Sequence, residues 1–232
     1  ANASVSLWQD SEDNLNNMIM DEKRQHTALE RVAQVLSDMF SPIVLPIYMM
    51  AVAMWVSPLV AVPEKTRFVM TGVVAALTAV IPTAVILALI RLGKVKDVSL
   101  SSRSERMIPY TVSILCYAAT AVVLYSVRAP MWLCSFYLGA GATSVVAALI
   151  TGKWKISAHS SAVGGVAAAL IWMGFKDMLL FGTPYWVSGG IVLCGLVGTS
   201  RLILCRHTPA QVFAGYALGA ASVTAMLLLF AN

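Results

Sequence analysis

Long apolar runs separated by short polar loops make up most of the chain after residue 40. A helix of roughly 20 apolar residues can cross the apolar core of a bilayer, and most of the runs are near that length. The runs occupy residues 41–62, 68–90, 110–127, 131–151, 162–180, 185–204 and 210–231. Only three residues join the third run to the fourth, so this pair is also compatible with a shallow hairpin that does not cross. We therefore expect an all-α, polytopic transmembrane helical bundle with six to seven spans.

The polar N-terminal part is expected to lie outside that bundle. Residues 1–17 are rich in Asn and Ser and begin without Met, which is typical of a disordered or artificially added tail. We assign residues 18–40 to an amphipathic interfacial helix, because between residues 25 and 40 apolar side chains recur at spacings of three and four opposite charged ones. These apolar residues are Leu29, Val32, Val35, Leu36, Met39 and Phe40. Docking of this helix onto a partner protein is the alternative, and residues 41–232 form the transmembrane domain.

Four prolines interrupt the first two runs. Pro42, Pro46 and Pro58 lie in the first run and Pro82 lies in the second. Because proline has no N–H, each leaves a carbonyl of the preceding turn without its helical donor. Membrane helices tolerate this where neighbouring groups supply the donor, so we predict kinks at these positions rather than a functional role.

Composition agrees with a membrane protein and narrows its chemistry. Of the 232 residues, 59% are hydrophobic and 12% are charged, whereas about 25% of residues are charged in soluble domains. The net charge is +5 and the cations lie in loops, which indicates contact with anionic headgroups rather than with nucleic acid. No Asp, Glu, Lys or Arg lies deep inside a run, a pattern that disfavours an ion-coupled transporter.

Metal chemistry is disfavoured because few ligands are present. The chain has three histidines, and after Glu64 its only acidic residues are Asp97, Glu105 and Asp177. A magnesium or two-metal site needs several carboxylates. We therefore expect a metal-independent reaction with no cofactor.

The remaining polar chemistry collects in three loops, at residues 91–109, 152–161 and 200–211. Two runs separate each consecutive pair of loops, so all three loops emerge on the same side of the membrane. A hairpin formed by the third and fourth runs would preserve this relation. The sequence thus predicts one composite site.

The third loop carries groups suited to phosphoryl transfer. Arg201 and Arg206 offer planar guanidinium groups that fit phosphate, and His207 offers an imidazole. Thr208 followed by a proline is typical of an N-cap and a first helical residue, so the final helix is predicted to begin here, beside His207. Gln211 lies four residues after His207 on the same helical face and is expected to hold the imidazole. An ordinary basic loop in the headgroup layer is the competing interpretation.

The second loop places His159 just ahead of a helix of small residues. Ser160 or Ser161 is the expected N-cap of this helix, which we predict to start near Ala162. A lone imidazole here is typical of an ordinary interfacial residue. A second imidazole on the same side as His207, however, indicates a nucleophile and an acid.

In order and spacing, the three loops resemble the signature motifs of the type 2 phosphatidic acid phosphatase superfamily, K-x6-R-P, P-S-G-H and S-R-x5-H-x3-D. The matching residues are Lys96 and Arg103 in the first motif, Ser157 and His159 in the second, and Ser200, Arg201 and His207 in the third. The departures are Ser104 and Ile156 in place of Pro, Ala158 in place of Gly, and Gln211 in place of Asp. The motifs and their one-sided topology cover roughly residues 68–231.

This resemblance implies an integral membrane lipid phosphatase that works through a phosphohistidine and needs no metal. His207 is then the nucleophile, His159 the general acid and Gln211 the residue that orients His207. The implied phosphate-binding groups are Lys96, Arg103, Ser157, the backbone N–H near Ala158, and Arg201, with Arg106, Ser200 and Arg206 as auxiliary groups. The lipid substrate and the bilayer are the expected partners.

Gln211 is the departure with chemical consequences. A Gln carbonyl accepts the same hydrogen bond as the family's Asp but adds no negative charge, so we expect the ring to keep its orientation and lose basicity. Three outcomes are open: a slower enzyme, a charge supplied by Asp97 or Glu105, or a protein that binds lipid phosphate without turning it over. A phosphotransferase that passes the phosphoryl group to an alcohol is a further alternative.

A site at helix ends beside the headgroup layer favours a lipid substrate over a soluble one. The candidates are undecaprenyl diphosphate, phosphatidic acid, phosphatidylglycerophosphate and lipid A phosphate. The resemblance suggests a bacterial inner membrane. Apart from the implied phosphate-binding and auxiliary groups, seven cations lie on the site's side (Lys23, Arg24, Arg31, Arg91, Lys94, Lys153, Lys155) and four on the other (Lys65, Arg67, Arg128, Lys176). This excess favours a cytoplasmic site, with the outer face, common among bacterial relatives of the family, as the alternative.

Overall fold

The structure is a computed structural model that describes residues 27–93 and 107–231. Every regular element in those two ranges is a helix, as the sequence predicts. The labelled helices are α2 (Leu45–Val56), η1 (Pro58–Ala61), α3 (Glu64–Ala75), η2 (Ala76–Val80), α4 (Ile81–Arg91), α5 (Met107–Ser126), α6 (Met131–Thr151), α7 (Ala158–Phe175), α8 (Thr183–Ile203) and α9 (Pro209–Phe230). An N-terminal helix over residues 27–39 precedes them.

Six segments of the described chain are long and apolar enough to cross a membrane. They are Glu64–Arg91, Ile108–Ser126, Met131–Thr151, Ala158–Phe175, Thr183–Ile203 and Pro209–Phe230. The two runs that were also compatible with a shallow hairpin form the full-length helices α5 and α6. The chain is therefore an integral membrane protein with an all-α bundle.

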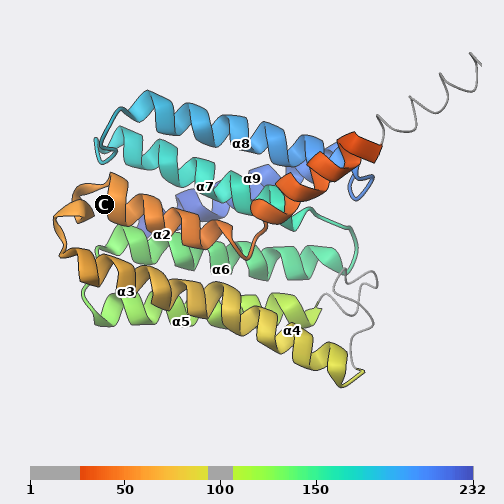
Figure 1. Cartoon of the computed structure of the whole chain (residues 1–232), viewed down its shortest axis with the longest axis horizontal. Helices are drawn as coiled ribbons and strands as arrows, with labels where there is room; N and C mark the ends of the chain where they lie inside the picture. The colour runs from red at the N-terminus through yellow and green to blue at the C-terminus, as the bar shows by residue number, and fades with distance from the viewer. Residues whose placement is uncertain (1–26, 94–106, 232) are drawn as a thin grey trace, which may run out of the picture.

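The spans lie side by side and alternate in direction along the bundle (Figure 1). The most extensive contact joins α7 to α9, and α8 packs on α7 while α6 packs on α9. α5 packs on α6, and the continuous segment formed by α3, η2 and α4 packs on α5. The helices that carry the predicted site residues therefore lie together, and α3, η2, α4 and α5 form an outer layer.

The first apolar run does not form the single span that its composition predicts. It forms α2, of 12 residues, followed by η1, a 3-10 turn of 4 residues. At 1.5 Å per residue α2 is about 18 Å long, well short of the roughly 30 Å of a bilayer core. Pro46 in the first turn of α2 and Pro58 just after its end set these limits, because proline is tolerated at a helix start but not inside. The N-terminal helix and α2 together run the length of the bundle (Figure 1), so the sidedness expected for the later helices is kept.

A tyrosine hydroxyl replaces the donor that Pro46 lacks, and a second tyrosine also donates to the backbone of α2. Pro46 has no N–H for the carbonyl of Pro42, and Tyr117 of α5 donates its hydroxyl to that carbonyl at 3.2 Å. Tyr137 of α6 donates to the carbonyl of Pro46 at 2.9 Å. In the second run a π-helical turn, η2, lies directly ahead of Pro82. The predicted compensation by a neighbouring helix is thus confirmed at Pro46.

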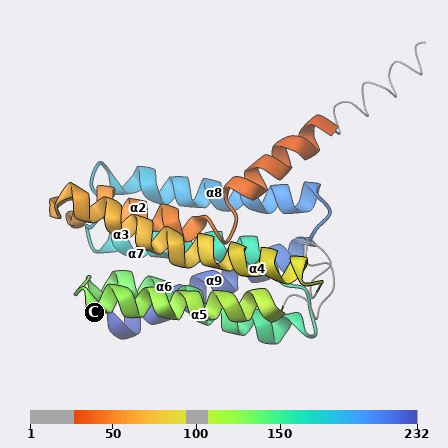
Figure 2. The ribbon, with the colours of Figure 1, turned by 60° about the horizontal axis from the view of Figure 1, so that its bottom comes forward.

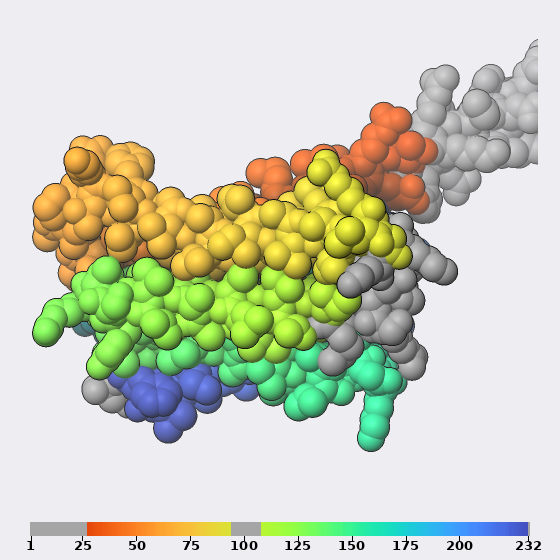
Figure 3. Space-filling model, turned by 90° about the horizontal axis from the view of Figure 1, so that it is seen from below, coloured from red at the N-terminus to blue at the C-terminus, as the bar shows by residue number. Residues whose placement is uncertain are grey.

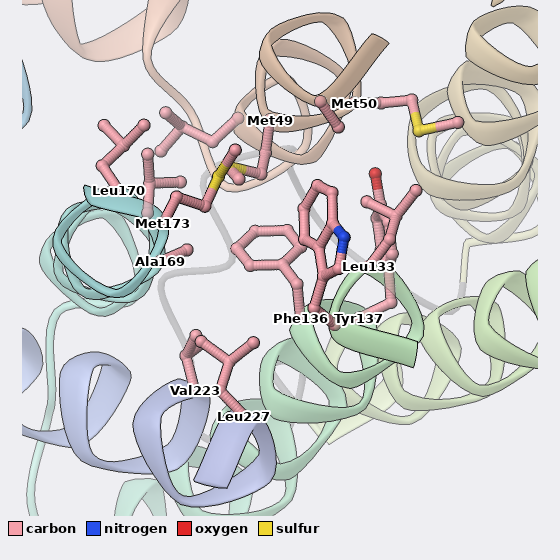
Figure 4. Close-up of a cluster of buried hydrophobic side chains, with 14 of the residues drawn as sticks. Met49, Met50, Leu133, Phe136, Tyr137, Ala169, Leu170, Met173, Val223 and Leu227 are labelled. Carbon is pink, nitrogen blue, oxygen red and sulfur yellow. The ribbon is translucent and has the colours of Figure 1, made fainter. Parts of the chain in front are cut away.

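A buried apolar cluster holds the short helix α2 inside the bundle (Figure 4). It brings Met49 and Met50 of α2 together with residues of α6, α7 and α9, namely Leu133, Phe136, Tyr137, Ala169, Leu170, Met173, Val223 and Leu227. Lipid tails are as apolar as these side chains, so close packing stabilises the cluster more than removal from water does. Methionine suits this task because its unbranched side chain fills irregular gaps.

Helices α3, η2, α4 and α5 cover one face of the molecule (Figure 3), and this face carries many exposed apolar side chains. Large side chains of these helices that are more than half exposed include Phe68, Val80, Leu115 and Val122. Soluble proteins avoid apolar surfaces of this extent, whereas membrane helices present them to lipid. We therefore interpret this face as a lipid-facing surface.

Glycines allow α7 and α9 to approach each other closely. A Cβ atom added to Gly215 would lie 2.8 Å from the carbonyl oxygen of Ser157, and one added to Gly164 would lie 2.5 Å from that of Tyr216. At Gly219 an added Cβ would collide with the backbone of Ser161. Small residues at such contacts are typical of tightly packed membrane helices. Because both helices start at the same end, this contact also fixes the separation of their first turns.

The N-terminal helix packs against α8 through small residues. Ala33 and Ser37 are 2% and 0% exposed, whereas Val32, Val35 and Met39 are each at least half exposed. Figure 2 shows the helix leaving the bundle at an angle beside α8. The apolar face that the sequence predicts is therefore exposed, as contact with lipid would require.

Candidate active site

The helix ends that carry the predicted site residues gather at one end of the bundle (Figure 1). This end contains the start of α7, the end of α8 and the start of α9, together with the end of α4 and the start of α5. The predicted one-sided arrangement is confirmed for these helix ends. Residues 94–106 lie outside the described residues. They include the predicted phosphate-binding and auxiliary groups Lys96, Arg103 and Arg106 and the alternative carboxylates Asp97 and Glu105.

A capping box opens α9, at the position predicted from Thr208 and Pro209. The Thr208 hydroxyl accepts a hydrogen bond from the backbone N–H of Gln211 at 3.4 Å. In return, Oε1 of Gln211 accepts one from the backbone N–H of Thr208 at 3.2 Å. Pro209 occupies the first turn, where its missing N–H has no helical partner to lose. These paired bonds fix the side chain of Gln211 at the start of the helix.

Gln211 also orients the imidazole of His207. Its Oε1 lies 3.2 Å from Nδ1 of His207. The Thr208 N–H can only donate, so the Gln211 atom that it contacts is the oxygen, and this oxygen can only accept. Nδ1 of His207 therefore carries the proton, and the lone pair of the ring lies on Nε2. The predicted contact is confirmed, and it selects the tautomer in which Nε2 can act as a nucleophile.

A tight turn between α8 and α9 sets the relation of Arg201 to His207. The N–H of Arg206 donates to the carbonyl of Arg201 at 3.1 Å, and the N–H of Cys205 donates to that of Leu202 at 2.9 Å. These are the two bonds of a Schellman C-cap. Cys205 has a φ of 50° here, a left-handed conformation that glycine usually supplies. The turn ends α8 sharply, so that α9 begins beside Arg201.

The two auxiliary residues of the third loop differ in their surroundings. Ser200 is buried, and its hydroxyl donates to the carbonyl of Leu196 in its own helix at 2.8 Å. Arg206 is exposed. Their contributions to phosphate binding stay predictions.

α7 begins earlier than the sequence predicts. Its first residue is Ala158 and its N-cap is Ser157, whose hydroxyl oxygen accepts from the N–H of Ser160 at 3.3 Å. The predicted caps, Ser160 and Ser161, are wrong, because both lie inside the first turns. Serines at all three positions satisfy the preference of an N-cap, and the local sequence does not distinguish them. The earlier start places His159 in the first turn of α7.

Ser157 joins the second loop to the third. Its backbone N–H donates to the carbonyl of Gln211 at 3.4 Å, and the residue is completely buried. Its hydroxyl accepts from Ser160 in the helix cap, so its predicted contact with phosphate stays a prediction. The backbone N–H of Ala158 belongs to the first turn of α7, where N–H groups have no partner within the helix, and this suits its predicted role.

His159 lies close enough to Arg201 and His207 for electrostatic interaction with both. Its ring also lies near the backbone of Ser37 in the N-terminal helix.

Ser37 is a site residue that sequence reasoning missed. Nη1 of Arg201 donates to its hydroxyl at 2.6 Å, across 164 residues of chain. Ser37 thus contacts Arg201 through its side chain and His159 through its backbone. One signal was present in the sequence: Ala33 and Ser37 are small residues four apart, a spacing typical of helix contacts in membranes.

The described part of the site combines two imidazoles, a guanidinium group and the first turns of two helices. Helix starts carry partial positive charge and present N–H groups to a ligand, and guanidinium binds phosphate oxygens in pairs. The arrangement therefore suits an anion with several oxygens, next to a nucleophilic nitrogen and a proton donor. Comparison of the chain with models of protein families, with curated proteins and with solved structures gives no match.

Proposed function

We propose that this protein is an integral membrane lipid phosphatase that hydrolyses a lipid phosphate or diphosphate without a metal, through a phosphohistidine. One observation carries the proposal: Nδ1 of His207 is hydrogen-bonded to Oε1 of Gln211, which puts the lone pair on Nε2. His159 and Arg201 lie close by. They supply a proton donor and a cation for the phosphate.

The reaction has two steps. In the first, Nε2 of His207 attacks phosphorus, an N–P bond forms, and the P–O bond to the lipid breaks while His159 gives a proton to the departing oxygen. In the second, a water molecule attacks phosphorus and gives a proton to His159, the N–P bond breaks, and inorganic phosphate leaves. Both histidines then have their original protonation.

Negative charge on the transferring oxygens needs donors that are already in place. Arg201 fits this role because its guanidinium group is held by the 2.6 Å bond to Ser37. The first turns of α7 and α9 add N–H groups and the positive ends of two helix dipoles.

The position of the site favours a lipid substrate. The helix ends lie at one end of a bundle of membrane-spanning length, so a phosphate there is at the level of the headgroups while its tail stays in the bilayer. The candidate substrates are those expected from the sequence. The family resemblance supports a bacterial inner membrane, and the loop charges support a site on the cytoplasmic side, with the outer face as the alternative. Labelling of the exposed Cys205 by an impermeant thiol reagent, with oriented vesicles, tests this sidedness.

A second candidate is a protein that binds lipid phosphate without hydrolysing it. The observation in its favour is Gln211, which holds His207 but brings no charge to stabilise the imidazolium that forms on attack. A lipid phosphotransferase would share the first step and differ only in the acceptor. Analysis of the products in the presence of an alcohol separates it from a phosphatase.

The test is phosphate release by the purified protein from a panel of lipid phosphates and diphosphates in excess EDTA, beside the variant His207→Ala. We expect release that persists in EDTA and disappears in the variant. Release that needs a metal, or that survives in His207→Ala, would contradict the mechanism. Binding of the lipids without release, equal in both proteins, would support the binding protein.

A further inference from the structure

An apolar groove runs between the N-terminal helix and α8. It is lined by Leu29, Val32, Ala33 and Leu36 of the N-terminal helix and by Gly195, Leu196, Thr199, Ser200 and Ile203 of α8. The N-terminal helix leans across this end of α8 in both ribbon views (Figures 1 and 2). From Gly195 to Ile203 the groove follows α8 for eight residues, or about 12 Å at 1.5 Å per residue.

The groove lies next to Arg201, the residue proposed to bind phosphate. Ser200 belongs to its lining, and the next residue along α8 is Arg201. The two helices that form the groove are the same two that the bond between Arg201 and Ser37 joins. A cationic residue therefore lies beside an apolar groove, an arrangement that is the complement of an amphiphile with an anionic head and an apolar tail.

We propose that this groove holds the apolar chain of the substrate lipid while its phosphate lies at Arg201. The inference rests on the proposed function, and it adds the place where the tail is recognised. The groove follows α8 from the headgroup end of the bundle towards its middle, the direction in which a lipid tail points from its headgroup. No side chain of α8 fills it at Gly195, where an added Cβ would meet no atom within 4 Å.

The chain offers a matched pair of variants to test this. Gly195→Leu puts a side chain into the groove, and open space at that position lets the fold accept it. Gly189→Leu makes the same change on α8 outside the groove lining, at a glycine that also has no atom within 4 Å of an added Cβ. Any effect of an extra leucine on helix stability or detergent binding should appear in both variants.

The measurement is the affinity of the detergent-solubilised protein for alkylphosphonates that lengthen by one CH2 at a time. These probes cannot be hydrolysed, so binding is read independently of turnover. For the wild type we expect each CH2 that enters the groove to tighten binding by up to about fourfold. Gly195→Leu should abolish this dependence on chain length and keep the affinity for the shortest probe, whereas Gly189→Leu should behave as the wild type.

Three outcomes of this measurement would contradict the proposal for the groove. Affinity that does not change with chain length in the wild type, a dependence that survives in Gly195→Leu, or no binding of any probe would overturn the groove as the tail site. Failure of the phosphatase proposal gives a different pattern, in which binding depends on chain length but natural lipid phosphates release no phosphate.

Discussion

The variant Gln211→Glu tests whether a missing negative charge limits the site. Glu has the same length as Gln, so its carboxylate can keep both present hydrogen bonds, at 3.2 Å to Nδ1 of His207 and at 3.2 Å to the backbone N–H of Thr208. The change therefore adds one negative charge without moving the ring. We expect faster phosphate release, because His207 becomes positively charged as its Nε2 bonds to phosphorus.

The size of the effect follows from the distance. Two unit charges 3.2 Å apart attract by about 5 kcal/mol at an effective dielectric constant of about 20. His207 and residue 211 are both only partly buried, so water screens part of this attraction, and only part of the charge has formed at the transition state. About 1.5–3 kcal/mol then remains, the range of a hydrogen bond to a charged group, which corresponds to a gain of about 10- to 150-fold in kcat.

The same change should leave the fold intact. Residue 211 is the third residue of α9, the position at which Glu completes a capping box with Thr208. A negative charge in the first turn is also stabilised by the helix dipole, by about 0.3–1 kcal/mol. The thermal unfolding midpoint in detergent should therefore stay the same or rise.

The assay is the initial rate of phosphate release from one lipid phosphate at saturating concentration. Gln211→Met is the control, because Met has a similar length but no oxygen to accept from His207, and we expect it to be slower than the wild type. If the Glu variant is no faster than the wild type and the Met variant is equally active, residue 211 does not orient the nucleophile, and the role assigned to Gln211 is refuted.

Three further predictions concern neighbouring residues. Arg201→Ala should lower kcat by about 100- to 1,000-fold, the cost of removing one preorganised donor to the transferring oxygens; near-normal turnover would remove Arg201 from the site. Ser37→Ala deletes the acceptor at 2.6 Å from Arg201 but keeps the backbone carbonyl near His159, and should lower kcat/KM by about tenfold or more. Ser135→Ala is its control, since this equally buried hydroxyl bonds only within α6, and an equal loss in both variants would mean that packing alone is at work. Cys205→Gly relieves the left-handed φ of 50° and should stabilise the protein by about 0.5–1 kcal/mol, measured as a higher unfolding midpoint; a lower midpoint would contradict this account of the turn.

Features that depend on neighbouring residues could be predicted from the sequence. The start of α9 and the contact between His207 and Gln211 are separations of a few residues along one helix, so the capping preference and the helical period determine them. The one-sided arrangement of helix ends also follows from local information, because it requires only the order and length of the apolar runs. Predicting these features required no knowledge of tertiary contacts, and the structure confirms them.

Features that depend on competing or distant partners could not be predicted in this way. Three serines near the start of α7 fit the preference for an N-cap equally well. The observed N-cap, Ser157, also donates its backbone N–H to the carbonyl of Gln211 at the start of α9. The first apolar run was expected to cross because its composition outweighed its prolines, yet Pro46 and Pro58 limit it to 12 helical residues. Ser37 accepts a hydrogen bond from Arg201, which is 164 residues away in the sequence. The residues around Ser37 do not identify Arg201 as its partner.

The distance between the two histidines depends strongly on helix packing inside the bundle. His159 lies in the first turn of α7 and His207 immediately precedes α9, so their separation depends on how closely these two helices pack. Gly215 sets that distance near the site, because an added Cβ would lie 2.8 Å from the carbonyl of Ser157. Even an alanine at Gly215 would push the two helix starts apart. The sequence motifs therefore identify the candidate reactive groups, and the glycine contact between α7 and α9 sets the distance between the helix starts beside which these groups lie.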